Sequence, residues 1–62
     1  MIVAFVRIVR EELEDELRTA EEGILNGPQD IDEYRRLVGK RQGLKSALAI
    51  IDETVKRFDD NT

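Results

Sequence analysis

The side chains that could do acid–base or metal chemistry are almost all carboxylates, and they gather in one stretch. The segment EELEDELRTAEE, residues 11–22, holds seven Glu and Asp residues and one basic residue, Arg18. Paired carboxylates catalyse proton transfer when a cleft gives them different proton affinities, but carboxylates along an exposed helix stay in water. A Ca²⁺ site would need a loop with EF-hand spacing, which the sequence lacks.

Nucleophilic catalysis also lacks its usual partners. Ser46 is the only serine, and the chain contains no His to activate it and no Cys. A zinc or iron site would have to be built from carboxylates alone, which is rare for those metals. We therefore expect a protein that is not an enzyme and that uses no metal, no cofactor and no small-molecule substrate.

A second charged stretch is basic and could bind phosphate groups. The segment RRLVGKRQGLK holds five basic residues and no acid. However, Tyr34 is its only aromatic neighbour, no Gly-rich loop leads into it, and the net charge of the chain is −4. We interpret the basic and acidic stretches as complementary partners. Nucleic-acid binding, and use of the acidic stretch as a DNA mimic or a lure for a basic host protein, are the alternatives.

The spacing of apolar residues predicts two helices, one from about residue 2 to 25 and one from about 31 to 58. Steps of three and four residues are typical of one helix face. The first stripe comprises Ile2, Val6, Val9, Leu13, Leu17, Ala20 and Ile24, and the second comprises Tyr34, Leu37, Leu44, Leu48, Ile51, Val55 and Phe58. A charged residue, Arg41, interrupts the second stripe, and the polar end DDNT is expected to fray.

The segment NGPQD, residues 26–30, separates the two helices. Gly27 suits the left-handed conformation that closes a helix, and Pro28 cannot continue one. Asp30 followed by Glu33 resembles a capping box that starts the second helix. The whole chain, residues 1–62, is therefore predicted to be a single all-α domain, an antiparallel helical hairpin.

The hairpin predicts which residues face one another along the seam, the line where the two helices meet. Facing residue numbers should sum to about 55–58, which pairs Leu13 with Leu44 and Val9 with Leu48. Arg41 then lies opposite Leu17, within reach of Glu14 or Glu16. A charge in an apolar seam is costly unless it is paired, so we expect such an ion pair to set the register.

Two facing stripes leave other apolar residues without a partner in the chain. Val3, Phe5 and Ile8 lie beside the first stripe, and Val38, Ala47 and Ile50 lie beside the second. A chain of this size buries too little surface for comfortable stability, and it has no disulfide. We expect the hairpin to be completed by oligomerisation or by a partner. The alternative for IVAFVRIV is a β-strand that adds to a sheet edge.

Two glycines interrupt the second helix four residues apart, and a small residue, Ala47, follows four later. Each interior glycine costs about 1 kcal/mol relative to alanine, so Gly39 and Gly43 indicate a close approach of some other group. That approach is either a local bend or packing within the chain, or a contact with another molecule. The predicted interface comprises Ile2, Val3, Phe5, Ile8, Gly39, Gly43, Ala47 and Ile50.

Location and membrane association are judged from apolar runs. None approaches the roughly 20 residues that span a bilayer, and the start lacks the basic region and small-residue cleavage site of a secretory signal. We expect a cytoplasmic protein that has no membrane partner.

Residues 32–58, DEYRRLVGKRQGLKSALAIIDETVKRF, resemble a group of small proteins of tailed bacteriophages. The matching positions are Tyr34, Arg35, Leu37, Gly39, Gly43 and Leu44. The resemblance covers the second helix only, and the family lends no catalytic residue. It implies a phage protein in the host cytoplasm or the virion. The expected function is a structural or assembly accessory protein, and the alternative is a regulator that inhibits a host protein.

Overall fold

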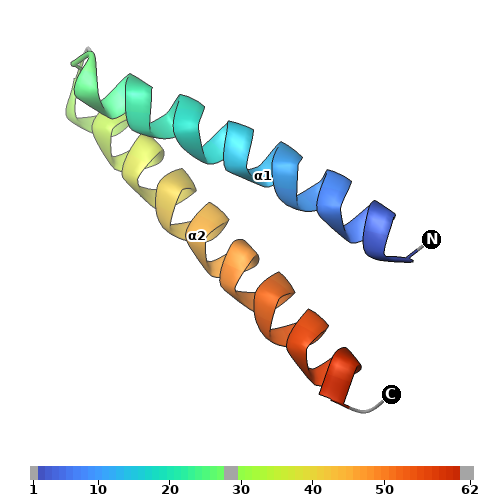
Figure 1. Ribbon diagram of the computed structural model, residues 1–62. Coiled ribbons are helices and arrows are strands. Elements are labelled where there is room, and N and C mark those ends of the chain that lie inside the picture. Colours follow the sequence, from blue (N-terminus) through green and yellow to red (C-terminus); the bar gives the residue numbers. More distant parts are fainter. Residues whose placement is uncertain (1, 28–29, 61–62) are drawn as a thin grey trace.

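The chain folds into two antiparallel helices joined by a tight turn. The computed structural model describes residues 2–27 and 30–60, with side-chain exposures for 3–27 and 30–59. Helix α1 spans Ile2–Leu25 and helix α2 spans Ile31–Asp60 (Figure 1). The predicted all-α hairpin is confirmed. The strand interpretation of residues 2–9 is wrong, because these residues form the first turns of α1.

The turn residues end one helix and start the next as their chemistry requires. Gly27 has a φ of +90°, a left-handed conformation that costs glycine little. Its backbone N–H donates to the carbonyl oxygen of Ile24 at 3.3 Å. The Oδ1 of Asp30 accepts a hydrogen bond from the backbone N–H of Glu33 at 2.8 Å, which confirms Asp30 as the cap of α2. Pro28 lies outside the described residues.

The far end of α2 is longer than predicted. The helix continues through Asp59 and Asp60, where fraying was expected. No residue there breaks a helix. Arg57 places a positive charge in the last turn, where it interacts favourably with the negative end of the helix dipole. Asn61 and Thr62 lie outside the described residues.

The seam between the helices contains the predicted apolar stripes, but it buries few residues fully. Ala20 is 2% exposed and Leu37 is 9% exposed, and both lie in the half of the hairpin next to the turn. A Cβ built on Gly23 would lie 3.4 Å from Cδ1 of Leu37. The most buried part of the seam therefore lies next to the turn, where Leu37 also lies against Gly23.

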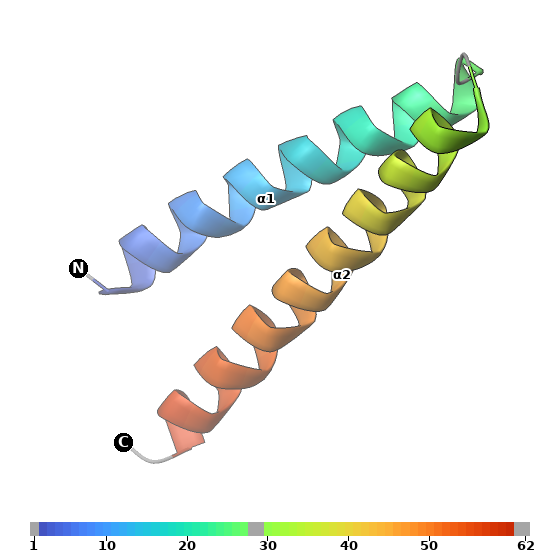
Figure 2. The ribbon, with the colours of Figure 1, turned by 180° about the vertical axis from the view of Figure 1, so that it is seen from behind.

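Away from the turn the two helices separate. The ribbons of α1 and α2 diverge from the turn toward the two chain ends (Figures 1 and 2). Val55 and Phe58, which the sequence places on the seam, are exposed. The molecule measures 48 × 16 × 12 Å, a rod one helix pair wide. Since residues 2–27 and 30–60 form no third element that covers the pair, the apolar residues near the far ends of the helices remain in contact with solvent.

Candidate interaction surface

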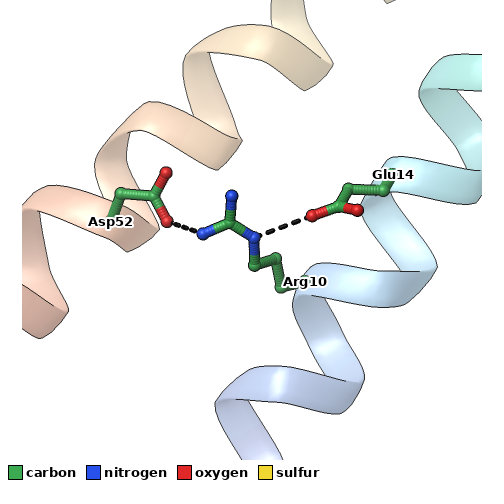
Figure 3. A network of polar contacts seen from close by, with 3 residues as sticks. All are labelled: Arg10, Glu14 and Asp52. Carbon is green, nitrogen blue, oxygen red and sulfur yellow. Dashed lines mark hydrogen bonds and ion pairs between the residues drawn. The ribbon is translucent and has the colours of Figure 1, made fainter.

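One side of the seam is lined by charged residues that connect the two helices. The Nε of Arg10 donates to Oε1 of Glu14 on the same helix at 2.7 Å, and its Nη1 donates to Asp52 on α2 (Figure 3). The hydrogen bond to Glu14, followed by the negative charge of Asp52, raises the pKa of Arg10. Arg10 therefore connects the diverging helices about a third of the way along α1.

Arg41 forms the expected ion pair with α1, but its partner differs from the predicted one. Its Nε lies 3.0 Å from Oε2 of Glu21, so the prediction of Glu14 or Glu16 is wrong. The facing rule places backbones opposite one another, whereas an arginine side chain reaches past a full helical turn of about 5.4 Å. Arg41 reaches along the seam toward the turn, where Glu21 receives it.

A third connection lies on the other side of the seam. The Nζ of Lys40 is 3.1 Å from Oε2 of Glu16. Successive residues of a helix point about 100° apart, so Lys40 and Arg41 leave α2 on opposite sides of the seam. Both pairs join the basic stretch to the acidic stretch, which confirms the predicted charge complementarity. Arg18 pairs within α1 with Asp15.

The ion pairs fix what lies along each edge of the hairpin. Residues 11 apart in a helix are three turns apart and share a face. Glu21 follows Arg10 by 11 residues and Asp52 follows Arg41 by 11, so both pairs lie on one edge. We call this the polar edge, and it comprises Arg10, Glu14, Glu21, Arg41 and Asp52.

The opposite edge carries most of the predicted interface. Phe5 precedes Glu16 by 11 residues, and Ile8 follows Phe5 by 3, so both lie on the side of the Glu16–Lys40 pair. From Lys40, steps of three, four and three lead to the small and apolar residues of α2. We call this the apolar edge, and it comprises Phe5, Ile8, Gly39, Gly43, Ala47 and Ile50.

The large residues of the apolar edge remain uncovered. Phe5 is 68% exposed, Ile8 is 55% exposed and Ile50 is 65% exposed, whereas Ala47 is half-buried. Val38 is also half-buried, but it precedes Arg41 by three residues and lies toward the polar edge. Val3 is 79% exposed, but it precedes Arg10 by two turns and therefore belongs to the side of the polar edge. The side chain of Ile2 lies outside the described residues.

The two glycines of α2 face open space within the chain. A Cβ built on Gly39 or on Gly43 would meet no atom within 4 Å. The alternative that they allow close packing against α1 is therefore wrong, and a local bend or a contact outside the chain remains. The glycine that packs between the helices is Gly23, which sequence reasoning missed. Nothing in the sequence separates Gly23 from the glycines of α2.

A second group of apolar residues surrounds the turn. Leu25, Ile31 and Tyr34 are exposed, and a shallow depression beside them is lined by Glu21, Ile24, Leu25 and Arg41. Tyr34 was expected on the seam. It precedes Arg41 by two turns, so it lies toward the polar edge instead. Sequence reasoning did not single out Leu25 and Ile31, although both flank the turn.

The structure was also searched for metal and membrane sites. Within residues 2–27 and 30–60, no three His, Cys, Asp or Glu side chains form a group that could hold a metal ion. In the same residues, neither helix has a stretch long and apolar enough to cross a bilayer. The features that stand out in the described part of the chain are therefore its uncovered apolar side chains.

Comparison with known proteins gave no relative. No family model matches the chain, and no curated protein or solved structure matches it. The functional argument therefore rests on the residues and geometry of the chain itself.

Proposed function

We propose that this chain is a non-enzymatic structural or assembly accessory protein of a tailed bacteriophage. It acts by docking its helices against copies of itself or against a capsid, portal or tail component. The phage assignment rests on the resemblance of residues 32–58. The mode of action rests on the helical hairpin, whose two ends and edges differ in chemistry. Its place of action is the host cytoplasm or the virion.

The observation that carries this proposal is the exposed apolar edge. Monomeric proteins seldom leave large neighbouring apolar side chains in water, and such patches usually mark contact sites. Phe5, Ile8 and Ile50 come from two helices and lie on the same edge, where a single partner can cover all of them. Burial of a large apolar side chain contributes about 1.5–3 kcal/mol, so covering these three residues gives a substantial drive to association.

The absence of enzymatic function is part of the same proposal. The charged side chains that connect the helices, such as Arg10, Glu14 and Asp52, are about half exposed. Their charges are satisfied by one another and by solvent, and the depression beside the turn is shallow and open. General acid–base catalysis needs groups held away from water beside a substrate. In the hairpin these charged groups connect the helices and are not held away from water beside a substrate.

The proposal is tested by asking whether the protein is part of the phage particle. Virions purified from an infected culture are analysed by quantitative mass spectrometry, and cross-linking of intact particles identifies the neighbour. We expect several copies per particle, with cross-links to a capsid, portal or tail protein or to another copy. As a control, a phage enzyme known to stay in the host cytoplasm should be depleted from the same particles.

The opposite outcome would support the regulator. In that case the protein is absent from purified particles, and one host protein is cross-linked to it in infected cells. Binding to nucleic acid would be seen as a mobility shift at low salt that disappears as salt rises, because phosphate contacts release counterions. Either result would overturn the assembly role.

A further inference from the structure

We propose that the apolar edge is covered by the same edge of a second copy, and that the two hairpins lie with their turns at the same end. The product is a two-fold symmetric bundle of four helices. This inference deepens the proposed function, because it names the partner for one of its two modes of docking. It is carried by the surface area, by the placement of the apolar residues and by the charges.

The single chain exposes more surface than a compact monomer of its mass, and the excess is about the area that one partner buries in a protein interface. The chain exposes 5160 Å², whereas a compact monomer with its mass of 7.1 kDa exposes about 4,100 Å². The difference is about 1,000 Å², and each partner in a standard protein interface buries about 800 Å². One copy of a similar rod laid along the hairpin would cover an area of this size.

The apolar edge is suited to an identical partner because its large apolar residues come to the same level in both copies. A two-fold axis along the rod places α1 of one copy against α2 of the other, and residues whose numbers sum to about 55–58 lie at one level. Phe5 of one copy therefore lies at the level of Ile50 of the other, and Ile8 lies at the level of Ala47. Gly39 and Gly43 leave open space on α2 nearer the turn, where α1 of the other copy can approach closely. In a two-fold interface each such contact occurs twice.

The charges select the orientation of the two hairpins. On the apolar edge, large apolar residues occupy the half toward the chain ends, and Glu16 and Lys40 occupy the half toward the turn. With both turns at one end, the halves of the two apolar edges that carry the large apolar residues meet each other. The acidic stretch of α1 then faces the basic stretch of α2 in the other copy. With the turns at opposite ends, Phe5 and Ile50 would face charged residues, which is costly.

The oligomeric state of the full chain is the first test. We expect sedimentation equilibrium at micromolar concentration to give twice the chain mass of 7.1 kDa. Ile50→Glu should raise the dissociation constant about tenfold or more, because it places an unpaired charge in the interface. Val3→Glu is the matched control. It introduces the same charge on the other side, at an apolar residue that is 79% exposed against 65% for Ile50, and should change the constant less than about twofold.

A second variant separates loss of the interface from loss of folding. Gly43→Leu adds a side chain where the single chain has free space, and leucine favours helix more than glycine. We expect its helicity by circular dichroism to equal or exceed that of the unmodified chain. The dissociation constant of its dimer should rise about tenfold or more. Unchanged dimerisation of both Gly43→Leu and Ile50→Glu would overturn the assignment of this edge.

The orientation is tested by one distance. The chain has no Cys, so Asn26→Cys places a single spin label on each turn. Turns at the same end of the bundle put the labels within about 20 Å of each other, because packed helices are 8–10 Å apart. Turns at opposite ends separate them by a distance close to the 48 Å length of the rod, and that result would overturn the proposed orientation.

Failure of this inference and failure of the proposed function give different results. A chain that sediments as a monomer up to millimolar concentration, yet is present in purified particles, removes the dimer and leaves the assembly role. If the chain sediments as a dimer and the variants behave as expected, but the protein is absent from purified particles, the assembly role is refuted and the dimer stands.

Discussion

The four glycines of this chain have different structural roles, and the surroundings of each glycine indicate its role. Gly27 closes α1 in a left-handed conformation, and Gly23 leaves room for Leu37. Gly39 and Gly43 have free space around them although they interrupt a helix. Sequence reasoning identified the role of Gly27 from its place before Pro28. It could not separate Gly23 from Gly39, because both are helical glycines and only the approach of the other helix distinguishes them.

Substitution of these glycines should therefore change stability in opposite directions. Gly39→Ala should raise the free energy of unfolding by about 0.5–1 kcal/mol, because alanine restricts the unfolded chain and meets no atom in the hairpin. Gly27→Ala should lower it by about 1 kcal/mol or more, because alanine is strained at a φ of +90°. Urea denaturation at a concentration too low for dimers to form measures both effects in the single hairpin, and a loss of stability in Gly39→Ala there would contradict the open space around Gly39.

Arg41 offers a second test at the residue scale, because the structure assigns it a partner different from those expected. Arg41→Glu should lower the midpoint of thermal unfolding, and adding Glu21→Arg should restore it, since the pair is re-formed with reversed charges. The expected coupling is about 0.5 kcal/mol, because both side chains are more than a third exposed. Glu14→Arg is the matched control. If it restored stability as well as Glu21→Arg does, the pairing with Glu21 would be refuted.

Helix positions in this chain were predictable because local residues determine them. The turn residues Gly27 and Asp30 define the end of α1 and the beginning of α2, and the apolar stripes define which faces meet. The partner of Arg41 was not predictable, because a long side chain selects among carboxylates on neighbouring turns. The divergence of the helices was not predictable either. The stripes run along both helices at full length, and the difference between the two ends comes from the turn that joins the helices and from the burial of Ala20 and Leu37 beside it.

The start of α2 depends on one side chain. Asp30→Ala removes the acceptor that receives the N–H of Glu33 at 2.8 Å, and should lower the free energy of unfolding by about 1 kcal/mol. Asp30→Ser keeps an acceptor at the cap and should cost much less. Thermal unfolding followed by circular dichroism compares the two. Equal losses for alanine and serine would mean that the negative charge at the helix start, and not the hydrogen bond, provides the stabilisation.

At the scale of the whole molecule, two kinds of interaction hold the hairpin, and they are distributed unevenly. Apolar burial is concentrated next to the turn, at Ala20 and Leu37. Farther along, Arg10 and Asp52 connect helices that have begun to diverge (Figure 3). Since exposed ion pairs contribute little, the half near the chain ends should be the first to open, unless another molecule covers it.

The ionic connection at Arg10 should respond to salt and not to moderate changes of pH. The pKa of Arg10 is raised above its ordinary value, first by the hydrogen bond to Glu14 and then by the charge of Asp52. The stability it contributes is fully present below that value and is lost only as the pH rises through the higher pKa of the folded state. We therefore expect a flat contribution from about pH 6 to 9. Salt should weaken this contribution, because the screening length falls from about 10 Å at 0.1 M salt to about 3 Å at 1 M.

The variant Arg10→Gln measures this contribution by difference. Its midpoint of thermal unfolding should lie below that of the unmodified chain at low salt and approach it at about 1 M NaCl. Arg7→Gln, on the same helix and with no ion pair among those the structure describes, is the control. A difference between Arg10→Gln and the unmodified chain that is independent of salt would show that Arg10 acts through the packing of its aliphatic stem.

The placement of the turn and the chain ends has a practical consequence for handling the protein. Both helices leave the turn in the same direction, so α1 begins and α2 ends at the end of the rod where Phe5, Ile8 and Ile50 are uncovered (Figure 1). An affinity tag or fluorescent reporter fused to either terminus would therefore crowd the surface that is proposed to bind. A reporter inserted between Asn26 and Asp30 lies at the far end, and lengthening a short loop costs little.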